Sequence, residues 1–591
     1  MLERPALLNV ARSATGRRWT GPDPTVERLG AAIVAETELP EVVAQVLAAR
    51  GVEPAEAAGY LAPTLRDLMP DPASLADMDA AAGRLARAAA SRQRVAIFGD
   101  YDVDGAASAA LIAEWLAHFG VGATVHIPDR VTEGYGPNAP AMQRLGAAHD
   151  LVVCVDCGTA APEPLAAARA AGADVVVIDH HLPGDALPEV AALVNPNRVD
   201  CAAGQEALCA AGVAFLVLVA ANRLLREQGI AVPDLRSSLD LVAVATVADV
   251  APLTGLNRAF VRQGLAVMAR RGRPGLAALA DTAGLRAPPR SSDLGFVLGP
   301  RLNAGGRVDE AGLSVRLLMA RGPDEAAALA AQVEAANQAR RRIEGAVLDH
   351  AVAQAEARLA AGGPAALAWA AGEGWHPGVV GIVAGRLRER FDCPAVVIAL
   401  NGGEGRGSAR SVPGVDLGSA IAAIAREGLI ARGGGHLMAA GLSLTPGQVA
   451  PAMAALADRL AAAGAAPGAA ETLAVDAVLA AEAATPELVT VLEAAGPYGQ
   501  GSPPPRVAMP ALVPEGVRVT DRGHCSMRLA AGPGRHRLAA IAFQAAENGL
   551  ARVIEAKAAA RAPLHVAGRL EIDDWGGRRR AKLRLDDVAP A

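Results

Sequence analysis

Three aspartates lie within five positions directly after an apolar run of the chain: Asp100, Asp102 and Asp104. Together with Gly105 they match the start of a calcium-binding loop, D-x-D-x-D-G. Such a loop also needs a glutamate at its twelfth position and a helix in front of it. The twelfth position here is Leu111, and the residues in front have the pattern of a strand. The sequence therefore excludes a calcium loop, and the three aspartates require other chemistry.

Other side chains of the kind that bind metals also follow apolar runs: Asp156, then Asp179 with His180 and His181, and then Asp249. Taken singly, each has an ordinary structural alternative. An aspartate after a strand commonly caps a helix, and adjacent histidines are commonly surface groups. Separate clusters at equivalent places along the chain favour one shared site instead.

The predicted ligand set contains five carboxylates and two imidazoles: Asp100, Asp102, Asp104, Asp156, Asp249, His180 and His181. Hard oxygen ligands combined with borderline nitrogen ligands suit Mn²⁺ or Mg²⁺ better than structural zinc. Because converging carboxylates repel one another, two divalent ions are the simplest way to stabilise them. Two such ions activate water and hold the attacking and leaving oxygens of a phosphoester. The residue types thus predict phosphoester hydrolysis, with Asp156 as the carboxylate shared by both ions.

A parallel sheet would bring these ligands together. Strand patterns occupy five apolar segments: 94–100, 123–129, 150–158, 173–181 and 191–197. Amphipathic helices such as 106–120 separate them, which is typical of a parallel sheet covered on both faces. Ligands of such sheets gather beyond the carboxyl ends of the strands, where Asp100, Asp156 and His180 fall. The apolar run before Asp249 has a helical pattern instead.

The remaining segments predict a multidomain α/β protein, because 591 residues are too many for one core. The predicted division is a helical segment 1–75, a parallel-sheet domain 76–323, a connecting helix 324–360, a second α/β domain 361–462 and an OB-like β-barrel 470–591. The connecting helix would be about 55 Å long at 1.5 Å per residue. The barrel is predicted from short strands separated by turn signals.

Charge is distributed unevenly along the chain. The net charge is −6, yet residues 506–587 carry 15 Lys and Arg against 9 Asp and Glu. A basic region on an acidic protein is typical of nucleic-acid contact in that region. The most apolar window, 211–222, is too short to span a bilayer and predicts a buried helix, so no membrane association is expected.

The 6 cysteines are too sparse for a disulfide framework, which favours a cytoplasmic protein. The first residues also lack the apolar core and the cleavage site of a secretion signal. Cys154 and Cys157 form a C-x-x-C pair, but no second pair follows at zinc spacing. Packing in the core is therefore favoured over zinc binding or redox chemistry.

Four motifs, in this order and spacing, resemble those of the DHH phosphoesterase superfamily: GDYDVDG (99–105), VDCGT (155–159), VIDHH (177–181) and VADVAPL (247–253). Further segments resemble its RecJ family of bacterial exonucleases specific for single-stranded DNA: IPDRVTEGYG (127–136), LGPRLNAGGRVDEAG (298–312), WHPGVVGIVAGRL (375–387), GSARSVPGVDL (407–417) and GGGHLMAAGL (433–442). The resemblance extends from about residue 80 to the end of the chain. It makes 76–323 the DHH catalytic domain and 361–462 the DHH-associated substrate-binding domain.

The resemblance implies a 5′-to-3′ exonuclease that releases mononucleotides with Mn²⁺ or Mg²⁺ and acts in DNA repair and recombination. It implies that one ion is held by four side chains: Asp104, Asp156, His180 and Asp249. The other ion would be held by Asp102 and the shared Asp156, with or without Asp100. Some members carry a histidine ligand at the position of Phe98, so Asp100 is its predicted substitute here. His181 would contact the scissile phosphate.

The second α/β domain supplies candidate substrate contacts: Ser408, Arg410, Ser411, Gly434, Gly435 and His436. Backbone N–H groups of a glycine-rich turn suit a phosphate, and serine and arginine side chains donate to one. Arg130 and Arg307 are candidates for clamping the DNA backbone. The structural alternatives are a packed turn, a solvated loop and a salt bridge. In the barrel, Tyr498 and Trp575 are candidates for stacking on bases, and 576–584 is the basic segment.

Three functions are compatible with these patterns. The first is the single-stranded-DNA exonuclease, the second a DHH hydrolase of pyrophosphate or short oligonucleotides, and the third a DNA-binding scaffold that has lost catalysis. The length and the basic barrel disfavour the second, and the complete ligand set disfavours the third. The family resemblance further implies a single-stranded-DNA-binding protein and a helicase as partners, and we expect a monomer.

Overall fold

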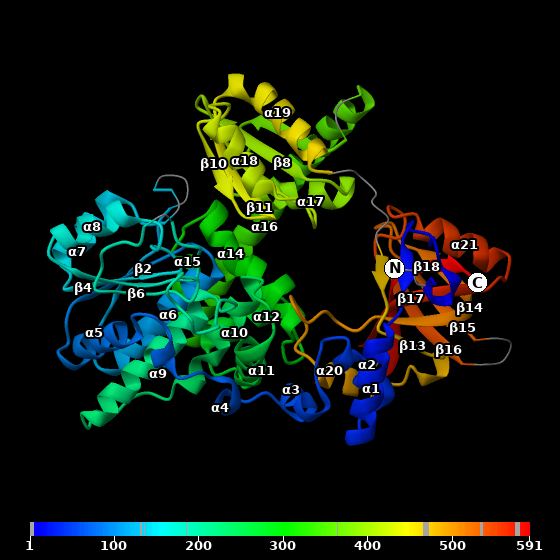
Figure 1. Cartoon of the computed structure of the whole chain (residues 1–591), viewed down its shortest axis with the longest axis horizontal. Coiled ribbons are helices and arrows are strands. Elements are labelled where there is room, and N and C mark those ends of the chain that lie inside the picture. Colours follow the sequence, from blue (N-terminus) through cyan, green and yellow to red (C-terminus); the bar gives the residue numbers. More distant parts are fainter. Residues whose placement is uncertain are drawn as a thin grey trace. The chain divides into compact units, whose positions relative to one another are not determined.

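The computed structural model describes residues 5–129, 133–134, 136–184, 186–362, 365–464, 472–531, 536–573 and 579–591. The chain forms two compact units, each discontinuous in sequence (Figure 1). The central unit comprises Met69–Ala251 and Gln263–Ala469, and the terminal unit comprises Met1–Leu68, Pro252–Arg262 and Ala470–Ala591. Within the described ranges, no helix combines the length and the apolar character that crossing a bilayer requires.

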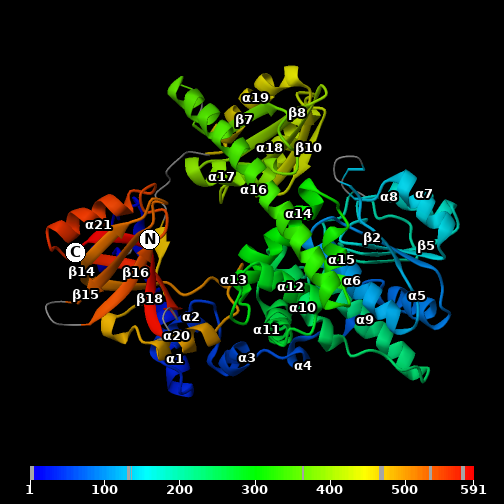
Figure 2. The same cartoon turned by 180° about the vertical axis from the view of Figure 1, so that it is seen from behind.

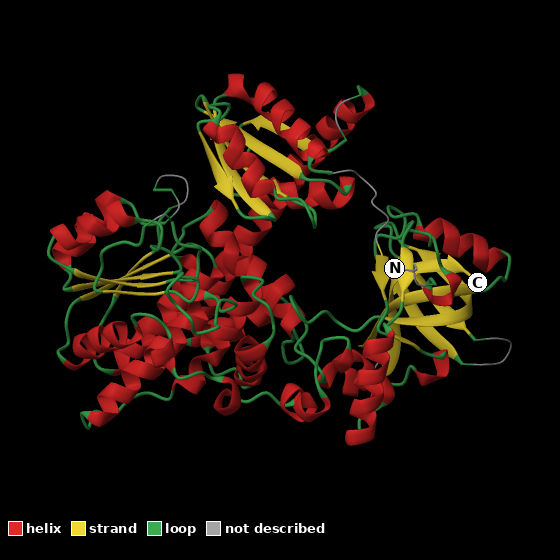
Figure 3. Cartoon of the chain, in the orientation of Figure 1, coloured by secondary structure: helices red, strands yellow, loops and turns green. Residues whose placement is uncertain are grey.

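A five-stranded parallel sheet forms the first part of the central unit, as predicted. Its strands are β2 (Val95–Gly99), β3 (Thr124–His126), β4 (Leu151–Val155), β5 (Asp174–Ile178) and β6 (Ala192–Val194). Their order is β3-β2-β4-β5-β6, and every neighbouring pair is parallel. All residues of β2 and β4 are buried because helices cover both faces of the sheet (Figure 3). This explains why their sequences are continuously apolar rather than alternating.

Helices from different parts of the sequence cover the two faces of this sheet (Figures 1 and 2). One face carries α7 (Ala139–Ala148) and α8 (Pro162–Ala170), and the other carries α5 (Met78–Ala90), α6 (Val103–His118) and α9 (Ala210–Glu227). Helix α9 contains the apolar window 211–222 and is buried over most of its length, which confirms the predicted buried helix. The run before Asp249 is α10 (Leu239–Ala248), also helical as predicted.

Several helices follow α10 in the chain: α11 (Gly255–Ala269), whose residues up to Arg262 belong to the terminal unit, α12 (Pro274–Thr282), α13 (Ser291–Asp293), α14 (Gly299–Val308) and α15 (Leu313–Met319). A π-helix, Leu294–Leu298, leads from α13 directly into α14.

The predicted connecting helix is α16 (Pro323–Ala360). Pro323 stands in the first turn, where its missing N–H breaks no helical hydrogen bond, and two acidic residues follow at the positive end of the helix dipole. The helix packs on α12 and α14 and then on β7 (Ala368–Glu373) and α17 (Val380–Phe391). Val347 in its second half belongs to the core formed with these last two elements. One helix therefore contributes to two successive cores.

The second α/β domain contains a five-stranded sheet in the order β10-β11-β9-β8-β7. Besides β7, its strands are β8 (Ala395–Asn401), β9 (Glu404–Arg410), β10 (Arg432–Gly435) and β11 (Ala439–Leu444). Strands β7 and β8 are parallel and α17 connects them, whereas the other pairs are antiparallel. Two more helices complete the domain, α18 (Leu417–Arg426) and α19 (Val449–Ala462). The predicted second α/β domain is confirmed.

The terminal unit contains a closed β-barrel. Its strands are β13 (Ala477–Val478), β14 (Val507–Val519), β15 (Cys525–Ala530), β16 (Arg537–Ala542), β17 (Leu564–Asp573) and β18 (Arg580–Pro590). They are ordered β13-β14-β15-β16-β18-β17, and β14 also pairs with β17, which closes the barrel. Helices α20 (Pro486–Ala494) and α21 (Leu550–Ala559) pack on its strands. The predicted OB-like barrel is confirmed.

The N-terminal segment is built into the same terminal unit. Its strand β1 (Arg18–Thr20) pairs in parallel with β12 (Thr472–Ala474). Trp19 is fully buried among barrel residues, and its indole N–H donates to the Asp587 carboxylate at 3.1 Å. Short helices follow, as predicted: α1 (Pro24–Glu36), α2 (Glu41–Ala48), α3 (Ala57–Leu61) and α4 (Leu65–Leu68). The beginning of the chain thus completes a core made mainly by its end.

Candidate metal centre

The first acidic loop connects β2 to α6. Asp102 caps α6, because its Oδ1 accepts hydrogen bonds from the N–H of Asp104 at 2.9 Å and of Gly105 at 3.2 Å. A side chain at Gly105 has no room, since its Cβ would lie 2.4 Å from the carbonyl oxygen of Asp100. The strand in front of the loop, and the buried Leu111 inside α6, confirm that this is not a calcium loop.

Asp104 is buried and faces the N-terminus of α9. Its Oδ2 accepts a hydrogen bond from the N–H of Ala210 at 2.6 Å, and its Oδ1 accepts one from the N–H of Ala211 at 2.8 Å. Oδ2 also lies 3.7 Å from Nε2 of His180. Each carboxylate oxygen has a second lone pair, so the helix can hold this carboxylate in place while it also binds a cation.

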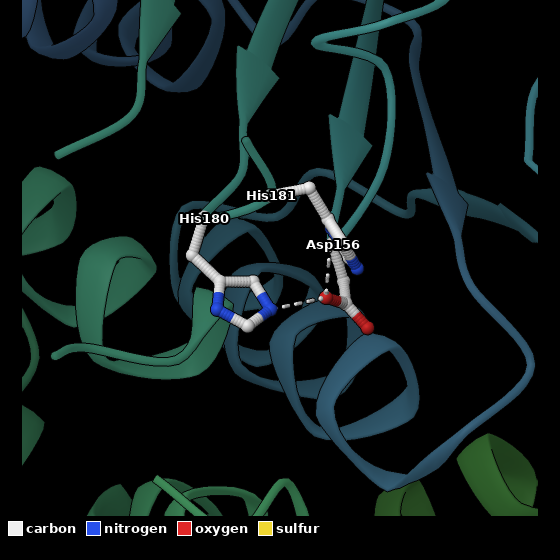
Figure 4. A group of neighbouring side chains, drawn as sticks. All are labelled: Asp156, His180 and His181. Atoms are coloured by element: carbon white, nitrogen blue, oxygen red, sulfur yellow. Dashed lines mark ion pairs between the residues drawn. The ribbon is translucent and has the colours of Figure 1, made fainter. Parts of the chain in front are cut away.

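Asp156 follows β4 in a strained backbone conformation. Its φ of 59° lies in the left-handed region, which non-glycine residues rarely adopt. Its Oδ1 lies 3.2 Å from Nε2 of His180 and 3.9 Å from Nδ1 of His181 (Figure 4). This oxygen is buried and accepts no hydrogen bond from any described residue. Because an unsatisfied buried oxygen is costly, it is well suited to a cation.

Asp179, at the end of β5, orients the histidine pair. Its carboxylate accepts hydrogen bonds from the backbone N–H groups of His180 at 2.8 Å and His181 at 3.2 Å. It also lies 2.8 Å from Nδ1 of His181. Burial favours a lower pKa for His181, but this hydrogen bond and the charge of Asp179 outweigh it and raise the pKa to about 9. The His181 side chain is 39% exposed and that of His180 only 17%, so His181 is the more accessible imidazole.

Asp249 immediately follows α10 and reaches the same place from a helix. Its Oδ2 lies 3.9 Å from Nδ1 of His180. Burial, together with the charges of Asp104 and Asp102, raises the pKa of Asp249 to about 8. Burial is also the main reason why the pKa values of Asp104 and Asp156 are raised. These carboxylates therefore repel one another and lack solvation.

The structure brings all seven predicted ligands together. Their donor atoms form three sets, each with its atoms within 4.8 Å of one another: Asp104–His180–Asp249, Asp156–His180–His181 and Asp100–Asp102–Asp156. His180 and Asp156 each belong to two sets, so the three form one continuous centre. An oxygen-rich set with imidazole nitrogen fits Mn²⁺ or Mg²⁺, and divalent cations would relieve the repulsion that raises the carboxylate pKa values. The residues present therefore fit the predicted ions.

Three asparagines support the centre and were not predicted. Asn195 and Asn197 follow β6, and their side-chain amides donate to the carbonyl oxygens of His181 at 2.8 Å and His180 at 2.6 Å. Because they stand at the carboxyl end of a predicted strand, the rule that located the aspartates could have found them. Asn303 in α14 accepts a hydrogen bond from the N–H of Val103 at 3.0 Å. In the sequence, only its position in a segment that resembles the RecJ family could have indicated this role.

In the second α/β domain, Ser408 and Arg410 of β9 face the first turn of α17. The expectation for Ser411 as a phosphate donor is wrong, because this residue is buried and its hydroxyl donates to the Val415 carbonyl oxygen at 2.8 Å. A Cβ on Gly381 would lie 3.1 Å from the Arg410 guanidinium and 3.4 Å from the Ser408 hydroxyl. Arg307 reaches the same region, since its guanidinium donates to the carbonyl oxygen of Gly378 at 3.3 Å. A helix N-terminus beside arginine side chains favours a bound anion.

The glycine-rich turn lies at the same end of that sheet. Gly434 and Gly435 belong to β10, and the N–H of His436 donates to the carbonyl oxygen of Ala439 at 2.8 Å. Ala439 pairs in turn with Arg410 of β9. His436 and Arg410 therefore stand at one level of the sheet, two strand spacings or about 10 Å apart. The predicted substrate contacts of this domain therefore stand at one end of the sheet, with Ser408 and Arg410 facing α17 and the glycine-rich turn against the first turn of α18.

Neither of the predicted stacking residues, Trp575 and Tyr498, is confirmed by the structure. Trp575 lies outside the described residues, as does the predicted backbone clamp Arg130. The expectation for Tyr498 is wrong, because its hydroxyl donates to the Leu492 carbonyl and its ring packs in a hydrophobic cluster. The barrel exposes Phe543 instead, with the His524 ring 5.2 Å and the Arg584 guanidinium 5.1 Å from the ring centre.

Cys154 and Cys157 are core residues. Both are buried with Phe98 in the cluster between the sheet and helices α7 and α8. Burial raises the pKa of both thiols well above the ordinary value, so they stay protonated and poorly reactive. Packing is therefore their role, and Phe98 fills the same core at the position where some superfamily members carry a histidine ligand.

Models of three known domain families match the chain. The DHH family N-terminal domain matches residues 94–246, the DHHA1 domain matches 362–462, and the RecJ OB domain matches 475–587. These ranges correspond to the parallel sheet with the metal centre, the second α/β domain and the barrel. Fold and site together define a protein of the DHH superfamily.

Known relatives are similar over most of the chain. It is 40% identical over 430 residues to the single-stranded-DNA-specific exonuclease RecJ of Dickeya dadantii, which covers 69% of this chain and 74% of that protein. It is 31% identical over 589 residues to the Bacillus subtilis protein of the same name, covering 98% and 71%. The chain belongs to the RecJ family. Its structure also resembles that of RecJ in complex with Mn²⁺ from Thermus thermophilus, with a TM-score of 0.78 and 29% identity over 97% of this chain and 79% of that one.

Proposed function

We propose that this chain is a metal-dependent exonuclease that hydrolyses single-stranded DNA from the 5′ end to mononucleotides, in DNA repair and recombination. The observation that carries the proposal is the convergence, at one sheet edge, of donor sets that share Asp156 and His180. Membership of the RecJ family supports the substrate, because these relatives are named single-stranded-DNA-specific exonucleases. The direction is what the family resemblance implies. Mn²⁺ or Mg²⁺ is supported by the ligand chemistry and by Thermus thermophilus structures of RecJ with each ion.

The ligand assignment that we propose uses Asp156 as the bridge. One ion is assigned four ligands: Asp104, Asp156, His180 and Asp249. The other is assigned Asp156, Asp102 and Asp100. The sets Asp104–His180–Asp249 and Asp100–Asp102–Asp156 support this division, as does the 3.2 Å between Asp156 Oδ1 and His180 Nε2.

His181 is assigned to the scissile phosphate. Its side chain is more exposed than that of His180, and Asp179 occupies its Nδ1. Nε2–H is then the group that donates to a phosphate oxygen, in a ring orientation fixed by the carboxylate. Asp179 acts as a positioning residue for this contact.

The protein's own contribution to the reaction is rigid placement of charge. Two bound divalent ions supply activated water and neutralise charge on the phosphate. The N-terminus of α9 holds Asp104, the backbone N–H groups after β5 hold Asp179, and Asn195 and Asn197 hold the backbone of the histidine pair. Because these groups are fixed before substrate arrives, little reorganisation accompanies the reaction.

We assign the second domain to the nucleotide that leaves. Ser408, Arg410 and the glycine-rich turn of Gly434, Gly435 and His436 would hold its phosphate. Arg307, and Arg130 from the resemblance alone, would clamp the adjacent DNA backbone. The position of Ser408 and Arg410 beside the first turn of α17 supports an anion at this place.

The proposed domain division follows the predicted boundaries. Residues 1–75 form a helical segment, 76–323 the catalytic domain, 324–360 the connecting helix, 361–462 the substrate-binding domain and 470–591 the nucleic-acid-binding barrel. In the barrel, Phe543 beside Arg584 replaces Tyr498 as the proposed stacking group.

For its cellular setting we propose a cytoplasmic monomer that cooperates with a single-stranded-DNA-binding protein and a helicase. The family resemblance supports these partners. Light scattering of the purified chain should give the mass of one copy. Addition of each partner should raise the rate of strand degradation, and a stable dimer or an unchanged rate would contradict this part of the proposal.

The central experiment offers three substrates with Mn²⁺ or with EDTA: end-labelled single strands, blunt duplexes and pyrophosphate. We expect Mn²⁺-dependent release of mononucleotides from single strands, with a 5′ label released before a 3′ label. Hydrolysis of pyrophosphate alone would indicate a small-phosphate hydrolase. Strand binding without hydrolysis in either condition would indicate a scaffold, and either result would overturn the proposal.

A further inference from the structure

A phenylalanine on the π-helix before α14 is exposed to solvent. Phe296 is 84% exposed, although the chain has only 7 phenylalanines and such side chains are mostly buried in proteins. Its neighbours Leu294 and Leu298 are buried, so the segment is anchored while this one ring is left outside. π-Helical turns are rare and occur frequently at functional sites.

The π-helix is held tightly against the end of α10. A Cβ on Gly295 would lie 3.4 Å from the side chain of Val247, and one on Gly299 would lie 3.3 Å from the Cβ of Ala248. Helix α10 ends at Ala248, immediately before Asp249. Phe296 therefore stands on an element that is fixed to the helix presenting a metal-type ligand.

One helix face leads from this ring toward the metal centre. Its accessible positions are Phe296, Pro300, Asn303 and Arg307, at spacings of four, three and four residues. Asn303 accepts the hydrogen bond from the N–H of Val103 in the first acidic loop, and Arg307 is the proposed backbone clamp. Seven residues at 1.5 Å each place Phe296 about 10 Å from Asn303 along the helix.

We propose that Phe296 stacks on a base of the single-stranded DNA substrate, at least three nucleotides from the hydrolysed bond, because Asn303 alone is about 10 Å away and a stacked nucleotide spans about 3.4 Å. This inference rests on the proposed function. Every base offers an aromatic face, so the contact tolerates any sequence. In a duplex, neighbouring base pairs cover those faces. The contact therefore favours single strands over duplexes.

The test measures affinity in the catalytically inactive Asp156→Asn background, by fluorescence anisotropy of a labelled strand. Adding Phe296→Ala should weaken binding by about 5- to 150-fold, the usual range for loss of one stacked base. Phe296→Trp should restore affinity, and Leu359→Ala, which truncates an exposed apolar residue on α16, should leave it unchanged. The thermal midpoint should be the same for all variants, because these side chains are exposed.

A series of strands with one abasic residue at successive positions locates the contact. At the stacked position, the missing base should weaken binding to the Asp156→Asn protein and should cause no further loss with Phe296→Ala. Equal affinities of these two proteins, or an affinity loss that is additive at every abasic position, would overturn the inference. If the wild-type chain neither binds nor degrades single strands, the proposed function itself fails, which this series distinguishes.

Discussion

The two sheets of the central unit end in opposite kinds of side chain. The parallel sheet collects buried carboxylates, whose pKa values burial raises, beyond β2, β4 and α10. The second sheet ends in an arginine and a serine beside the first turn of α17, and in a glycine-rich turn against the first turn of α18. The first arrangement is stabilised by cations and the second by anions. A phosphate bound between divalent ions and basic groups requires both.

The carboxylate-rich end of the parallel sheet (the acidic end) and the arginine-containing end of the second sheet (the basic end) also differ in how firmly their side chains are held. Backbone N–H groups fix Asp104 and Asp179 at short distances, and Asp156 is locked in a strained turn. His436 and Arg410, by contrast, stand at less buried strand ends. Rigid groups suit the reacting atoms, and adaptable groups suit a substrate whose bases vary. The comparison predicts that substitutions at the acidic end change turnover, whereas those at the basic end change affinity.

The largest effect is expected at the bridge. Asp156→Ala should lower kcat by about 10³-fold or more, because metal ions supply several kcal/mol of transition-state stabilisation. Single-strand affinity should be nearly unchanged. Single-turnover kinetics with excess protein measure the first and anisotropy the second. Cys157→Ala, a buried neighbour, is the control and should stay active. If Asp156→Ala retained its turnover, the acidic end could not be the catalytic site.

A smaller loss of turnover is expected from the positioning residue. Asp179→Asn should reduce kcat by about 10- to 100-fold, the usual effect of losing a carboxylate that orients a histidine. Asp174→Asn, at the opposite end of the same strand, weakens the ion pair with the buried Arg84 but should leave kcat unchanged, so it tests whether the effect depends on position. Equal losses in the two variants, measured by initial rates at saturating strand, would show that strand stability rather than orientation is involved.

At the basic end, Arg410→Ala should raise KM about 10- to 150-fold and leave kcat within about threefold, since a hydrogen bond to a charged group contributes about 1.5–3 kcal/mol. Arg406→Ala is a matched control, because it lies on the same strand and the same face about 13 Å away. Its KM should be unchanged. A fall in kcat with unchanged KM for Arg410→Ala would abolish the distinction between the two ends.

The smallest effect concerns strain beside the acidic end. Val250 follows Asp249 with a φ of 60° and is 63% exposed, at a helix C-terminus where glycine is usual. Val250→Gly should stabilise the protein by about 0.5–1 kcal/mol, because glycine adopts this left-handed conformation without steric strain. Arg92→Gly, with a φ of 50° at the end of α5, should stabilise it similarly. Thermal midpoints measure both. Lower turnover in Val250→Gly alone would show that the valine side chain serves the site.

Much of this site was predictable because each ligand follows an apolar run. Parallel strands put their carboxyl ends at one edge, so Asp100, Asp156 and His180 had to meet once the strands were recognised. The hydrogen bonds that hold Asp104 to α9 were not predictable, since the partners are separated by 106 residues without a local signal. The stacking prediction for Tyr498 was wrong for a related reason. The sequence shows an aromatic residue near a basic region but does not show whether its ring is buried.

The pairing of β1 with β12 also has a consequence for the order of events during synthesis. Strand β1 and Trp19 leave the ribosome roughly 450 residues before β12, an interval of about 20–90 s at 5–20 residues per second. The strands of the parallel sheet emerge within that interval and can assemble first. Trp19 has no barrel to pack against until the strands from β14 to β18 have been made. A side chain made early is thus buried only after most of the elements described above have emerged.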